Sequence, residues 1–182
     1  MLKQPIERVI DLLDPSLNIL LNMDYAEAQA RVMSGDVQRI GEIDGQFAIV
    51  AREGKTVRLA RSIGRPVRYF LAKRAEGPCL IVGERIDQIR QALAREGLEG
   101  QFHPSYTRMV PAHHLLELQL VGCPDPNPSL QRFFDPGHQK LDANIEAIGQ
   151  AYVGRLATEC NLWLDRIGDR EPIGVLFSGG VD

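Results

Sequence analysis

Short apolar runs bounded by turn residues predict several β-strands up to residue 121. The strongest signal is a hairpin, with strands over residues 46–52 and 56–61 joined by a turn at Glu53-Gly54-Lys55. Five shorter apolar runs predict further strands, at residues 17–21, 67–72, 79–82, 107–110 and 115–121. Together these runs indicate a small β-rich domain.

Three segments of the same region instead repeat apolar positions every three or four residues, which predicts helices. Residues 5–13 place their apolar side chains on one helical face. A second helix is expected over residues 25–33, where Asp24 stands in position to serve as its N-cap. A third, over residues 85–95, closes at Gly97.

Prolines mark a boundary after the last strand. Residues 122–137 contain four of the eleven prolines, which is typical of a linker. A long amphipathic helix is then predicted, capped by Asp142 or Asn144, and a closing strand is expected over residues 173–177. The apolar stripe of this helix, which we expect to be part of a core, contains Ile145, Ile148, Tyr152, Leu156, Cys160, Trp163 and Ile167.

These elements divide the chain into three parts. Residues 1–121 form a first domain, residues 122–140 a linker, and residues 141–182 the beginning of a second domain. The expected fold class is α+β: a β-sandwich domain with flanking helices, followed by the helix and first strand of an α/β domain.

Composition and charge restrict the class of protein. The 182 residues carry 21 basic and 24 acidic side chains, interspersed, for a net charge of −3. The absence of a basic run argues against a nucleic-acid partner. No apolar stretch approaches the roughly 18 residues of a membrane span, and the charged N-terminus does not resemble a signal peptide. We therefore expect a cytoplasmic protein with no membrane partner.

Candidate chemistry is sparse before the end of the chain. Cys79, Cys123 and Cys160 lie far apart, which argues against a disulfide framework or a zinc site. Gly54-Lys55-Thr56 lies at a hairpin turn, which is the wrong context for a phosphate loop. Three arginines near the hairpin, Arg61, Arg65 and Arg68, are expected to form a solvated face, although Arg65 could grip an acidic group.

The last residues carry the clearest chemical pattern. Leu176-Phe177 ends an apolar run that leads into Ser178-Gly179-Gly180, and Asp182 follows. Two glycines let a ligand oxygen approach backbone N–H groups, and a serine hydroxyl adds a donor. A carboxylate at Asp182 could hold Mg²⁺ beside a pyrophosphate. By chemistry alone, a phosphate site and an ordinary strand end both remain open.

This stretch resembles the pyrophosphate-binding loop, Ser-Gly-Gly-x-Asp-Ser, of the ATP pyrophosphatase superfamily. Upstream segments resemble the glutamine amidotransferase domain of asparagine synthetases, in the same order. They are Asn22-Met23-Asp24, Glu42 to Val50, Leu59 to Phe70, Val82-Gly83-Glu84 and Val110-Pro111-Ala112-His113. The resemblance covers about residues 17–182 and implies an N-terminal-nucleophile-hydrolase-like sandwich followed by a PP-loop synthetase domain.

The departures from this family are equally informative. The family's N-terminal cysteine nucleophile has no counterpart, because the chain begins Met1-Leu2. The family's Arg-Asp is here Arg61-Ser62, and of its Gly-Ser-Asp only Asp24 is kept. A terminal amine must serve as base for the thiol in such hydrolases, so we expect no glutamine hydrolysis. Asp24, the degenerate glutamine-site position, is then expected to act as a helix N-cap.

The resemblance implies an asparagine-synthase-like ligase that forms amide bonds, the reaction class of asparagine biosynthesis. ATP and Mg²⁺ would be its cofactors, bound through Leu176, Phe177, Ser178, Gly179, Gly180 and Asp182. Because the loop's second serine and the following helix are missing, we expect an inactive N-terminal fragment of a longer protein. The alternative is a non-catalytic scaffold or partner-binding subunit, and a homodimer or a partner subunit stays open.

Overall fold

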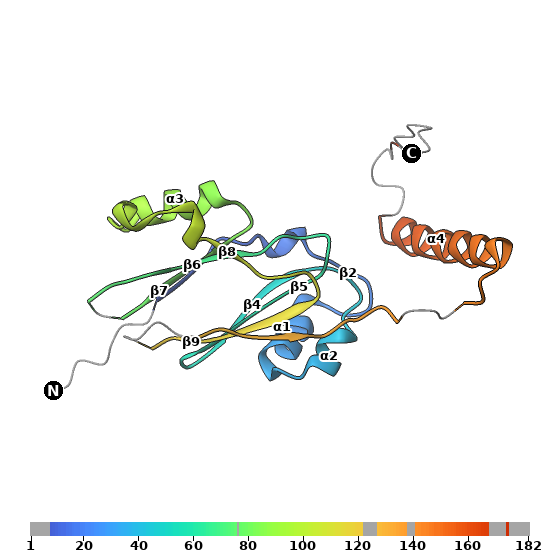
Figure 1. The fold of residues 1–182 in the computed structure, drawn as a ribbon, viewed down its shortest axis with the longest axis horizontal. Coiled ribbons are helices and arrows are strands. Elements are labelled where there is room, and N and C mark those ends of the chain that lie inside the picture. The colour runs from blue at the N-terminus through green and yellow to red at the C-terminus, as the bar shows by residue number, and fades with distance from the viewer. Residues whose placement is uncertain (1–7, 76, 122–126, 138–140, 168–173, 175–182) are drawn as a thin grey trace. The chain divides into compact units, whose positions relative to one another are not determined.

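The computed structural model describes residues 8–75, 77–121, 127–137, 141–167 and 174, and these residues have a mixed α+β fold (Figure 1). The chain divides into two units, residues 1–136 and residues 137–182. The α+β class is therefore confirmed. No described helix has both the length and the apolar character that a membrane crossing requires.

Two four-stranded sheets make up the first unit. One has the strand order β10 (Ser129–Arg132), β9 (His114–Gln119), β5 (Thr56–Arg61), β4 (Ala48–Glu53), and all its pairings are antiparallel. The other has the order β1 (Arg8–Asp11), β7 (Cys79–Gly83), β6 (Arg68–Ala72), β8 (Arg108–Met109). A small separate ladder joins β2 (Ile19–Leu20) to β3 (Gly45–Gln46).

The two sheets share one apolar layer. Strand residues at alternate positions point to the same face, and one such set from each sheet meets in this layer. It contains Leu13, Ala48, Val50, Val57, Leu59, Val67, Tyr69, Leu80, Val82, Val110, Leu116, Leu118 and Leu120. The sheets therefore form a sandwich, with the main core of the unit between them.

Helices bury the outer faces of both sheets. Residues Ile49, Ala51 and Ala60 pack against α1 (Tyr25–Ser34) and α2 (Val37–Gly41). Phe70 and Ile81 of the other sheet pack against α3 (Ile86–Arg95). Figure 1 shows α3 on one side of the sheets and α1 with α2 on the opposite side. The first unit thus has four layers, helix–sheet–sheet–helix, as expected for a sandwich with flanking helices.

Most predicted elements in the described part of the chain match observed ones, but one is wrong and others were not predicted. The helix predicted over residues 5–13 is wrong, because Arg8–Asp11 forms β1, a strand parallel to β7. Tertiary pairing with Cys79–Val82 outweighs the local helical spacing. Residues 129–132, expected to be linker, form β10 on the edge of a sheet. Helix α2, which begins after an Asp36 cap, was not predicted.

The second unit contains α4 (Ile145–Ile167). Asn144 caps it, since its side-chain oxygen accepts hydrogen bonds from the N–H groups of Glu146 at 3.0 Å and Ala147 at 3.2 Å. Its apolar stripe is exposed rather than buried in a core, with Trp163 at 39% and Ile145 at 91% exposure. Of the strand expected over residues 173–177, only Gly174 lies within the described residues, in no regular element.

Gly45 is the tightest backbone position of the sandwich. Its φ of +125° is one that L side chains rarely adopt, and an added Cβ would lie 1.9 Å from the carbonyl oxygen of Ile19. Gly54, in the β4–β5 turn, also has positive φ, at +56°, but a Cβ there meets nothing within 4 Å. The two positions therefore separate backbone strain from a steric clash.

We predict that Gly45→Ala lowers the free energy of unfolding by about 3 kcal/mol or more, since it adds a backbone clash to the strain. Gly54→Ala should cost only about 1 kcal/mol, the strain alone. Urea titration of both variants measures the difference. Equal losses would contradict the close approach of β2 and β3.

Candidate functional site

The structure separates the predicted site residues into two groups. Leu176, Phe177, Ser178, Gly179, Gly180 and Asp182, the predicted ATP and magnesium residues, lie outside the described residues. Asp24, which the sequence resemblance predicts as a degenerate glutamine-site position, lies in the first unit and is described. The candidate site residues with a described geometry therefore belong to the first unit.

Asp24 caps α1, as its cap pattern predicts. The carboxylate is exposed, and its Oδ1 accepts a hydrogen bond from the N–H of Glu27 at 2.8 Å. The preceding Asn22 is also used locally: its side chain donates to the carbonyl of Glu42 at 2.8 Å and accepts from the N–H of Asp44 at 3.0 Å. Both polar side chains of this segment therefore stabilise the local fold.

Two buried arginines lie at the end of β5 and in the loop after it. The expectation of a solvated face is wrong for Arg61 and Arg65, which are only 8% and 6% exposed. Arg61 donates to the carbonyl oxygens of Val110 at 2.6 Å and of Arg65 at 3.0 Å. Burial, and then the charge of Arg68, lower the pKa of Arg61 from its ordinary value. Arg61 thus ties the loop after β5 to the end of β8 through backbone acceptors.

Arg65 grips an acidic group, as the sequence suggested. It forms an ion pair with Glu84 and donates to Oδ1 of Asn18 at 2.7 Å and to the carbonyl of Asp14 at 3.1 Å. Burial lowers the pKa of Arg65, and the neighbouring Asp14 and Tyr25 oppose that shift. Arg65, Glu84, Asn18 and the Asp14 carbonyl, here called the Arg65 network, therefore connect three separate segments of the chain.

Local structure positions the partners of Arg65. Glu84 lies between β7 and α3, where the side chain of Gln88 accepts hydrogen bonds from the N–H groups of Glu84 and Arg85, at 3.1 and 3.0 Å. Asn18 Oδ1 also accepts from the N–H of Ala48 at 2.8 Å. Among the described residues, the buried Nδ2 of Asn18 finds no acceptor. The network is charge-compensated but keeps one open donor.

Ser62 stands where the resembled family has aspartate. It is buried, and its Oγ accepts a hydrogen bond from the N–H of Phe47 at 2.9 Å. Arg61 consequently has backbone carbonyls around it rather than a neighbouring carboxylate. No sequence pattern indicated Asn18 as a site residue. Glu84 was indicated only by the resemblance of Val82-Gly83-Glu84 to a segment of the family named above.

The described part of the chain offers little for covalent chemistry. Cys79 is fully buried in β7, and burial raises the pKa of its thiol, which favours the unreactive protonated form. Cys160 is exposed on α4. No three acidic, histidine or cysteine side chains of the described residues gather as metal ligands. The buried polar residues Arg61, Ser62 and Arg65 make hydrogen bonds that organise the sandwich.

Comparison with known proteins leaves the family open. No family model matches the chain, and no curated protein matches it.

Charge neutralisation at Glu84 tests the Arg65 network. Glu84→Gln leaves the buried Arg65 without its anion, so we predict a loss of about 2–3 kcal/mol in the free energy of unfolding. The matched control is Glu99→Gln, which removes an exposed pair with Arg90, 3.2 Å apart, and should cost less than about 0.5 kcal/mol. Similar losses for both variants in urea titrations would show that Arg65 does not depend on Glu84.

Two substitutions at Asp24 separate capping from ligand binding. Asn is as good an N-cap as Asp, so Asp24→Asn should keep stability within about 0.5 kcal/mol, whereas Asp24→Ala should lose about 1 kcal/mol. Thermal unfolding with and without glutamine is the measurement. A glutamine-induced rise in melting temperature that Asp24→Asn abolishes would contradict the capping role.

Proposed function

We propose that this chain belongs to an asparagine-synthase-like, ATP-dependent amide-forming ligase whose amidotransferase-like domain does not hydrolyse glutamine. The observation that carries the proposal is the four-layer sandwich of the first unit, with α1 and α2 on one sheet and α3 on the other. This arrangement agrees with the N-terminal-nucleophile-hydrolase-like domain that the upstream sequence resembles. The sequence Leu176 to Asp182 adds the resemblance to a pyrophosphate loop.

The proposed reaction has two steps. A substrate carboxylate oxygen attacks the α-phosphorus of ATP, which forms an acyl-adenylate and releases pyrophosphate. Ammonia or a substrate amine then attacks the acyl carbon, and AMP leaves with the carboxylate oxygen. Ser178 and the glycine N–H groups would stabilise charge on the departing pyrophosphate, and Asp182 would hold Mg²⁺ beside it.

The described residues support the absence of glutaminase activity. Asp24, which in the resembled family holds the amino group of glutamine, is engaged in capping α1. Cys79 is buried at 0% exposure, so glutamine could not reach its thiol. The nitrogen would therefore come from free ammonia or from an amine of the substrate.

The test is ATP–pyrophosphate exchange by the protein expressed from its whole reading frame, with aspartate and a panel of other carboxylic acids. We predict acid-dependent exchange that Asp182→Asn lowers by about 100-fold or more, because the loop loses its metal-binding charge. Asp165→Asn, at an exposed position on α4, is the matched control and should exchange at the wild-type rate.

The same preparation should release no glutamate from glutamine. Glutamate release would overturn the non-glutaminase part of the proposal alone. No exchange with any acid, together with no ATP binding by calorimetry, would overturn the ligase. Recovery of a partner that supplies ATP-dependent activity in trans would favour the non-catalytic scaffold instead.

A further inference from the structure

In the sheet of β1, β7, β6 and β8, hydrogen bonding along the β8 side of β6 is interrupted at one residue. Near its start, β6 pairs with the β8 segment: the carbonyl of Val67 accepts from the N–H of Val110 at 2.9 Å, and Tyr69 is paired with Arg108. Beyond its end, the side-chain amide of Gln101 takes the place of a strand. It accepts from the N–H of Lys73 and donates to the carbonyl of Lys73, both at 2.8 Å.

Leu71 lies between these two closures. In an antiparallel strand the N–H and C=O of one residue point to the same edge, and alternate residues share that edge. Val67, Tyr69 and Lys73 all make their bonds on the side away from β7, so the backbone groups of Leu71 face this side too. The described residues supply no hydrogen-bond partner for them. One donor and one acceptor of the sheet edge are therefore left open.

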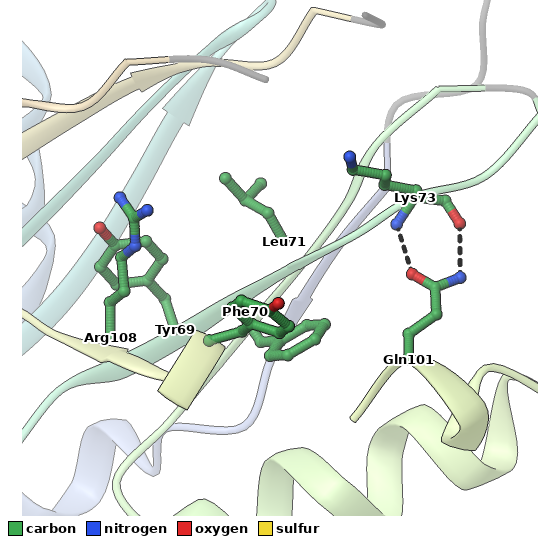
Figure 2. Close-up of a pocket in the computed structure, with 7 residues that line it drawn as sticks. Tyr69, Phe70, Leu71, Lys73, Gln101 and Arg108 are labelled. Carbon is green, nitrogen blue, oxygen red and sulfur yellow. Dashed lines mark hydrogen bonds between the residues drawn. The ribbon is translucent and has the colours of Figure 1, made fainter. Parts of the chain in front are cut away.

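A cavity of about 530 Å³ lies at this gap (Figure 2). Its described lining consists of Tyr69, Phe70, Leu71, Lys73, Gln101, Tyr106 and Arg108. Figure 2 shows Arg108 beside Tyr69 on one side of Leu71 and Lys73 on the other. The lining combines two cationic side chains with apolar surface, and none of its described residues is acidic.

Arg108 is the residue best placed to select a ligand. Burial raises the pKa of Tyr69, and the hydrogen bond and charge of Arg108 at its hydroxyl oppose that shift. No described carboxylate forms an ion pair with Arg108, which contrasts with the paired Arg65. A guanidinium presents parallel N–H donors that match a carboxylate, and Leu71 supplies apolar surface beside it.

We propose that this edge cavity, lined by the seven residues above, binds a small carboxylic acid with an apolar body. The carboxylate pairs with Arg108, and the apolar part covers Leu71. The volume falls in the usual range for small-ligand sites, roughly 300–1,000 Å³. The proposal is independent of the proposed ligase activity, which uses residues 176–182.

The open stretch of β6 is too short to pair with an added peptide strand. Strand addition requires a row of open backbone groups along the edge. Here β8 closes the edge at Tyr69 and Gln101 closes it at Lys73, so only the groups of Leu71 remain. A bare phosphate fits less well, because it would leave the apolar lining uncovered.

The test is a titration of the protein with phenylacetate, followed by the ¹⁵N–¹H shifts of the backbone amides. We expect saturable shifts at Leu71 and Lys73 with a dissociation constant on the order of 1 mM. Phenylacetamide, which is matched in size but uncharged, and inorganic phosphate should each bind about tenfold more weakly or not at all.

Two variants test whether Arg108 binds the carboxylate of phenylacetate. Arg108→Gln should weaken phenylacetate binding about tenfold with an otherwise unchanged spectrum, and Arg52→Gln, an exposed arginine on β4, should leave it unchanged. Equal binding of acid and amide, or no effect of Arg108→Gln, would overturn the proposal. Stronger shifts with an uncharged, end-blocked extended peptide than with phenylacetate would also overturn it, in favour of strand docking.

Discussion

Packing of the two sheets against one shared apolar layer is the constraint on which the first unit depends. Because β4, β5, β6, β7 and β9 are covered on their outer faces by helices as well, each has apolar residues at two or more successive positions, such as Leu59-Ala60 in β5. Each buried strand contributes to two clusters at once: in β5, Val57 and Leu59 face the other sheet while Ala60 faces α1 and α2. The helices and sheets are therefore stabilised together.

The buried arginines follow from the same arrangement. The loop after β5 has to pass the end of the sandwich, where backbone carbonyls would otherwise lie buried without donors. Arg61 supplies donors to two of those carbonyls, and Arg65 joins the loop to Asn18 and Glu84. Arginine side chains normally lie at the surface or bind a ligand, but these two stabilise the fold. Both arginines therefore stabilise the architecture of the first unit.

Sequence reasoning predicted what depends on neighbours in the chain. The hairpin of β4 and β5, helices α1 and α3, and the Asp24 cap all rest on local patterns, and all are present. It was wrong about β1, whose partner β7 lies some 70 residues away, and about β10, which has one apolar residue, Leu130, and lies within a proline-rich stretch. The Arg65 network could not be foreseen, because its members come from three distant segments. The open backbone groups of Leu71 are bounded on one side by the hydrogen bonds of the Gln101 side chain to Lys73. No sequence pattern indicates that role for Gln101.

The proposed function rests on a sandwich in which Cys79 is fully buried and on a terminal sequence that resembles a pyrophosphate loop. Its central claim is that a carboxylate is activated by adenylation. The most direct measurement uses an acid that supports exchange, labelled with oxygen-18 in its carboxylate, and analyses the products by mass spectrometry. Adenylation predicts that one labelled oxygen appears in AMP for each amide formed. Label in inorganic phosphate with ADP as the product, or unlabelled AMP, would contradict the claim.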